Sequence, residues 1–173
     1  MILDPLKAAL LVFVVALAQV SIVSAYAPLG GTADVVLVTL LSLALLRGSV
    51  FGAVAGFTAG LLIDTANLGT LGFTSLLLTL AGYWIGRYGE TTARDRFHAP
   101  YTSVGVVTVL YAFGSLALRF VLGDSAPAGD VLSALPSSLL LNLVLTLPVY
   151  ALVRRLLPPL DLADRIHEVR LLG

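Results

Sequence analysis

The residues that could support catalysis or bind a metal are few in this 173-residue sequence, and they lie far apart. There is no cysteine, and neither His98 nor His167 has a metal-ligating residue three or four positions further on. No G-x-S-x-G, H-E-x-x-H or P-loop motif occurs. No candidate base stands at helical spacing from Ser75, Ser103, Ser115, Ser137 or Ser138. The sequence therefore predicts no catalytic residue, no metal site, no cofactor and no enzymatic activity.

Three polar side chains lie within or at the rim of long apolar segments, where ionisable groups are functional candidates. Asp64 could cap the turn that follows it, 65–69, or line a polar cavity. Arg119, near the predicted end of its helix, could extend to the lipid headgroups or form a salt bridge with Asp64 or Asp124. Asn142 should point inward, either to hydrogen-bond another helix or to contact a ligand.

Glycine recurs at every fourth position between residues 48 and 60: Gly48, Gly52, Gly56 and Gly60. On a helix this spacing makes one smooth face, and small residues allow two helix backbones to approach closely. The stripe predicts a close helix–helix contact. Its partner could be another helix of this chain or a separate subunit, and the sequence does not distinguish between them.

The composition indicates that membrane-spanning helices position these residues. Apolar residues make up 58% of the chain and charged residues 12%, and the mean hydropathy is +1.01. Ordinary soluble domains are roughly 25% charged. A bilayer-spanning helix needs about 20 mostly apolar residues, so the chain has room for six spans and short connections. The net charge is zero, and the ten basic residues are scattered, which argues against nucleic-acid binding.

Turn-forming and polar residues divide the chain into an all-α, polytopic membrane domain over residues 1–155 and a short amphipathic cytoplasmic tail over 156–173. Arginine at mid-bilayer costs about 2.5 to 3.5 kcal/mol, so Arg47-Gly48 should separate two short spans. The predicted spans are 8–25, 34–46, 49–63, 73–85, 102–122 and 132–153.

The distribution of basic residues predicts the orientation of these spans. With a cytoplasmic N-terminus, nine of the ten Lys and Arg residues fall on the cytoplasmic side, and Arg119 alone lies near an outer end. The opposite orientation would break the positive-inside rule. Both termini are therefore expected in the cytoplasm.

One segment carries a family resemblance. The pattern Gly48-x-x-x-Gly52-x-x-x-Gly56-Phe57-x-x-Gly60-Leu61-Leu62-x-Asp64, followed by Leu71-Gly72-Phe73, resembles the rod shape-determining protein MreD family. The basic Arg87 after the fourth span and the Pro148 region followed by Arg154-Arg155 also fit that family.

The resemblance implies a non-catalytic scaffold of the cell-elongation machinery in the bacterial cytoplasmic membrane. Its implied partners are an MreC-like bitopic membrane protein, with MreB filaments, a RodA-type polymerase, a penicillin-binding transpeptidase, membrane lipids and a second copy of the chain as further candidates.

The family's fold also resembles the substrate-binding subunits of energy-coupling-factor transporters, which leaves a small-molecule-binding subunit as the alternative. Those subunits typically carry alanines four residues apart on the first helix. The alanines of the first span here never have that spacing.

Overall fold

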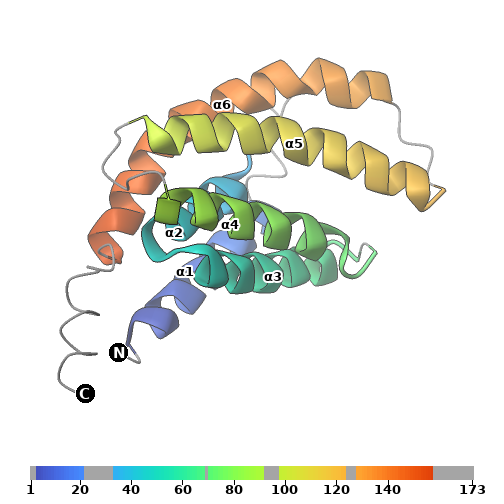
Figure 1. The fold of residues 1–173 in the computed structure, drawn as a ribbon. Coiled ribbons are helices and arrows are strands. Elements are labelled where there is room, and N and C mark those ends of the chain that lie inside the picture. Colours follow the sequence, from blue (N-terminus) through green and yellow to red (C-terminus); the bar gives the residue numbers. More distant parts are fainter. Residues whose placement is uncertain (1–2, 22–32, 69, 92–97, 124–127, 158–173) are drawn as a thin grey trace.

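The computed structural model describes residues 3–21, 33–68, 70–91, 98–123 and 128–157. These residues form helices and no strand, as the all-α prediction requires (Figure 1). In chain order the helices are α1 (Leu3–Ser21), α2 (Val35–Arg47), α3 (Ser49–Ala66), α4 (Phe73–Thr91), α5 (Ala99–Val121) and α6 (Ala128–Leu156).

Three of the described helices, α3, α5 and α6, are long and apolar enough to cross a membrane. The apolar part of α1 and the whole of α2 are shorter. The chain is therefore a helical membrane protein, in agreement with its composition.

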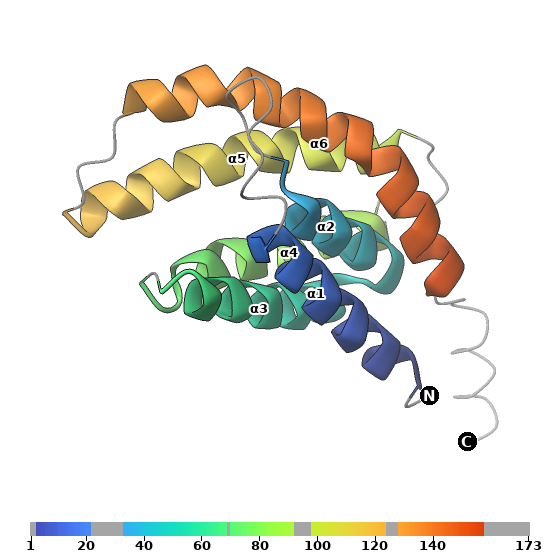
Figure 2. The same cartoon turned by 180° about the vertical axis from the view of Figure 1, so that it is seen from behind.

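The helices form two antiparallel pairs around a central helix. In Figure 1, α5 and α6 run side by side above the pair α3–α4, and the view from behind shows α1 crossing beside α3 (Figure 2). Helix α2 contacts all five other helices. Helix α6 contains Pro136 and Pro148 and bends toward its C-terminal end, consistent with the kink expected at Pro148 (Figure 2).

Helix α2 is the centre of the core because every residue from Val36 to Arg47 is buried. Its 13 residues span only about 20 Å, which is less than the roughly 30 Å of a bilayer's hydrocarbon. It therefore starts inside the molecule rather than at the far surface. At its other end Gly48, with φ +95°, is the single residue between α2 and α3, so the predicted separation of two short helices at Arg47-Gly48 is confirmed.

The glycine stripe of α3 lies against α4 of the same chain. A Cβ atom added to Gly52 would overlap the carbonyl oxygen of Gly82, and one added to Gly82 would overlap that of Gly52. Gly56 meets the backbone of Leu78 in the same way, and Gly60 meets that of Ser75. The two backbones are thus in direct contact, and this face of α3 is covered from within the chain.

Several helices are longer than the sequence predicted. Helix α4 continues past the expected end at residue 85 to Thr91, because no proline interrupts its polar last turns. Helix α6 begins at Ala128, inside the segment expected as a loop, and includes Arg154 and Arg155. The predicted tail lies almost wholly outside the described residues.

The α3–α4 contact predicts that Gly56→Leu destabilises the protein by more than the roughly 1 to 3 kcal/mol of ordinary overpacking, since backbone atoms cannot move aside. The melting temperature in detergent, obtained by size-exclusion chromatography of heated samples, measures the effect. Gly129→Leu is the matched control, because a Cβ at Gly129 has nothing within 4 Å. Equal melting temperatures for Gly56→Leu and the parent would contradict the contact.

Candidate functional site

The joint between α2 and α3 is closed by a carboxylate from α4. The Glu90 Oε1 atom accepts hydrogen bonds from the Ser49 backbone N–H at 2.8 Å and from the Ser49 hydroxyl at 3.0 Å. Glycine is favoured at position 48 by its positive φ, and a Cβ there would lie 2.5 Å from the same Glu90 oxygen and would push this carboxylate away from Ser49. Glu90 lies beyond the predicted span 73–85. The pKa of its carboxyl is lowered, chiefly by the hydrogen bond from the Ser49 N–H.

The opposite end of the pair carries the reciprocal cap. Asp64, in the last turn of α3, is 4% exposed. Its carboxylate accepts hydrogen bonds from the backbone N–H groups of Gly72 at 2.9 Å, Thr74 at 3.1 Å and Ser75 at 3.4 Å, at the start of α4. Asp64 is therefore a cap, but it caps the next helix rather than the turn 65–69. Negative charge is favourable at this position because unpaired N–H groups and the helix dipole converge there.

Asp64 and Arg119 also line one polar cavity of about 480 Å³ between the α3–α4 turn and the C-terminal half of α5. Thr74, Tyr111 and Ser115 contribute to the same wall. The Arg119 guanidinium lies 5.9 Å from the centre of the Phe73 ring, a cation–π contact. Among the described residues Arg119 forms no salt bridge, and Asp124 lies outside them.

Asn142 joins α6 to α2 and α5, which agrees with the inward direction expected for it. Its side-chain oxygen accepts from the Asp34 backbone N–H at 2.7 Å, and its Nδ2 donates to the Thr108 hydroxyl at 3.2 Å. Gln19 of α1 joins the same region, accepting from the Val35 N–H and donating to the Ala33 carbonyl, both at 2.9 Å. These bonds hold the buried start of α2.

A second cavity, of about 420 Å³, adjoins this junction. Asp34 and Asn142 lie on its wall, and it shares Tyr111 and Ser115 with the cavity of Asp64 and Arg119. The structure thus brings Asp64 close to Arg119 and places Asn142 beside the neighbouring cavity, while the four glycines lie apart on the α2–α3 joint and the α3–α4 contact.

Sequence reasoning missed several residues of this arrangement. The glycines of α4 are one case, and the spacing of Gly82 and Gly86, four residues apart, could have revealed them. Glu90 and Gln19 are another, and their roles carry no local signal because the side chain of each binds a different helix. Asp34 was missed as well, although its position three residues before Leu37, at the start of an apolar run, is the local signal of a helix cap.

In a comparison with protein families, the family described as rod shape-determining protein MreD matches residues 4–158. No curated protein and no solved structure matches the chain.

The cap at the start of α4 predicts that Asp64→Ala lowers the free energy of unfolding by about 1 to 3 kcal/mol, because buried N–H groups lose their acceptor. Asp64→Asn retains one acceptor oxygen, so its free energy of unfolding should lie between those of Asp64→Ala and the parent. The melting temperature in detergent measures both variants. Asp130→Ala is the control because Asp130 is exposed, and a surface change costs less than about 0.5 kcal/mol. A parent-like melting temperature for Asp64→Ala would show that the cap does not contribute to stability.

Proposed function

This chain belongs to the MreD family of rod shape-determining proteins, and from that premise we propose that it is a non-catalytic membrane scaffold of the cell-elongation machinery. It binds an MreC-like bitopic membrane protein and helps to couple MreB filaments to peptidoglycan synthesis by a RodA-type polymerase and a penicillin-binding transpeptidase. The family match over residues 4–158 is the observation that carries the proposal.

The hydrogen bonding of the buried polar groups supports a non-catalytic role. Both oxygens of Asp64 accept backbone N–H groups, and Asn142 uses both its oxygen and its nitrogen between helices. A general base or nucleophile needs a reactive atom within reach of a substrate. Here the polar atoms of Asp64 and Asn142 are already hydrogen-bonded to other parts of the bundle.

The proposed topology has six spans in the bacterial cytoplasmic membrane, with both termini in the cytoplasm. The arrangement of the helices supports it. In Figure 1 the start of α1, the α2–α3 joint, the end of α4 and the end of α6 lie on one side, and the α3–α4 turn and the far ends of α5 and α6 lie on the other. The first side carries Lys7, Arg47, Arg87, Arg154 and Arg155, as the positive-inside rule requires of a cytoplasmic side.

The proposed partner surface is the outer half of the α5–α6 hairpin. Because α4 covers the glycine stripe, a separate protein must meet another face. Between residues 109 and 141 the described residues include none that is buried, whereas α2 is buried along nearly its whole length. A single transmembrane helix could pack there without displacing any helix of this chain.

The topology predicts that reporter fusions or cysteine labelling place residue 95 and the C-terminus in the cytoplasm and residues 65 and 127 outside. The chain has no native cysteine, so each introduced cysteine reports alone. A periplasmic C-terminus would rule out six spans with a cytoplasmic start.

The scaffold role predicts that the protein, purified in detergent, brings down a single-span periplasmic protein. Ala117→Trp and Ser133→Trp, on the exposed surface of the hairpin, should reduce this recovery, while Val54→Trp on the exposed face of α3 should not. Depletion should make a rod-shaped host round up while bulk wall synthesis continues. Rods that keep their shape, together with a bound small molecule or a vitamin-uptake defect, would favour the transporter subunit instead.

A further inference from the structure

The seam between α4 and α5 contains two cavities of opposite character that meet end to end. At the outer end is the polar cavity of about 480 Å³ that holds Asp64 and Arg119. Further along the same two helices lies an apolar slot of about 390 Å³. Tyr111 lines both, so the two cavities adjoin at this side chain, and together they are called the α4–α5 groove.

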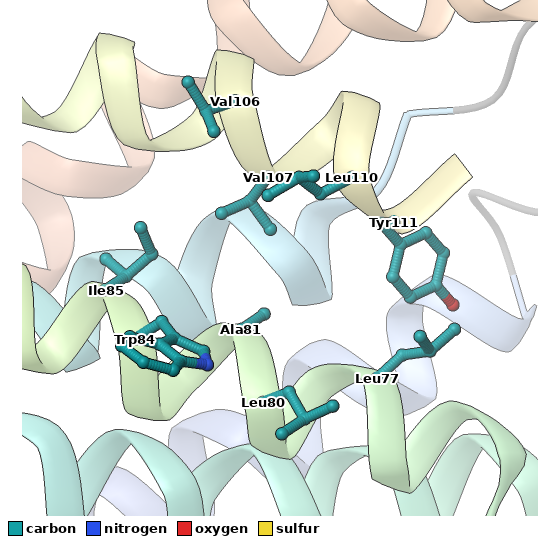
Figure 3. A pocket seen from close by; sticks show the side chains of 9 residues that line it. All are labelled: Leu77, Leu80, Ala81, Trp84, Ile85, Val106, Val107, Leu110 and Tyr111. Atoms are coloured by element: carbon teal, nitrogen blue, oxygen red, sulfur yellow. The ribbon is translucent and has the colours of Figure 1, made fainter. Parts of the chain in front are cut away.

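Figure 3 shows the apolar slot. Side chains of α4, from Leu77 to Ile85, face side chains of α5, from Val106 to Tyr111. Tyr111 stands at one end and Trp84 toward the other (Figure 3). Several of these side chains are strongly exposed, with Leu110 at 62% and Trp84 at 65%, so the slot opens sideways onto the surroundings of the protein. In a membrane protein those surroundings are hydrocarbon.

The polar cavity presents one exposed cation to a ligand. Asp64 and Arg119 are the charged residues of the polar cavity among the described side chains. The Asp64 carboxylate is buried and turned toward the N–H groups of α4, whereas Arg119 is exposed and has no acidic partner in the described chain. Arginine binds phosphate with a fork of N–H donors.

The length of the groove fits one leaflet of a bilayer. At 1.5 Å per residue, the slot from Leu77 to Ile85 is about 12 Å long, and the groove from Arg119 to Val106 is about 20 Å long. The hydrocarbon of one leaflet is about 15 Å deep. A molecule lying here would have a polar head at the membrane surface and an apolar tail that ends near mid-bilayer.

We propose that the α4–α5 groove binds a phospholipid with an anionic headgroup. Arg119 contacts the phosphate in the polar cavity, and an acyl chain lies in the slot beneath Tyr111 and against Trp84. This site depends on the membrane location of the chain and the outward position of Arg119, not on the scaffold role.

The chain's single tryptophan makes the site testable in the purified protein. The protein is placed in phosphatidylcholine vesicles with a few per cent of lipid brominated near the end of its acyl chains, and quenching of Trp84 fluorescence is measured. Brominated phosphatidylglycerol should quench about fivefold more per molecule than brominated phosphatidylcholine, the preference expected from one arginine near an anionic lipid.

Arg119→Gln should remove that preference, and Arg119→Lys should retain most of it. Arg154→Gln, which removes an exposed charge at the other end of the bundle, should leave it unchanged. Circular dichroism and size-exclusion chromatography of each variant verify the fold. Equal quenching by the two lipids in the parent would overturn the proposal, as would a preference that survives in Arg119→Gln or disappears in Arg154→Gln. Loss of the preference on adding millimolar inorganic phosphate would assign the polar cavity to free phosphate and overturn the lipid site.

Because no partner protein is present in this assay, its failure says nothing against the scaffold role. Conversely, lipid binding at the groove would persist if the co-purification experiment failed. The two proposals can therefore be rejected separately.

Discussion

Direct contact between the backbones of α3 and α4 is the constraint on which the rest of the structure depends. Glycine on both helices removes the side chains that would hold them apart, as at Gly52 and Gly82. Each helix then ends close enough to the other's start for a carboxylate to reach it: Asp64 caps α4, and Glu90 receives the N–H and hydroxyl of Ser49. Packing and capping therefore support each other, since the caps form only at this short separation.

The tight pair also determines how α2 is buried. Helix α2 lies against α3 and α4 on one side and α6 on another, which covers its apolar residues all round. Its start lies inside the bundle, where an unpaired N–H group costs several kcal/mol in hydrocarbon. Asp34, Gln19 and Asn142 supply the missing bonds from its own cap, from α1 and from α6. A helix shorter than the hydrocarbon of the bilayer is thus stable because its neighbours satisfy its polar end.

The sequence predicted the elements of this fold better than their pairing. Hydropathy and the Arg47-Gly48 break located the six helices, and the glycine spacing identified the close-packing face of α3. Periodicity within one helix carries no information on which helix is the partner, so α4 and its glycines went unnoticed. Asp64 was expected to be a cap or a cavity residue, and the structure makes it both, with the start of α4 as the target. Such contacts depend on tertiary geometry.

The same constraint separates a rigid part of the molecule from an open one. The short α2 fills the half of the bundle that holds the α2–α3 joint, and nearly all buried residues of α5 and α6 lie in that half. Beyond Asp34 the α5–α6 hairpin continues without a central helix to pack on, and the two polar cavities lie there. In a lipid bilayer the hydrophobic effect does not drive two helices together, so their association depends on close packing and on hydrogen bonds between polar groups. The open half supplies both, in cavities lined by hydroxyls, carboxylates and one arginine, and it is therefore where the proposed lipid and the proposed partner helix would find specific contacts.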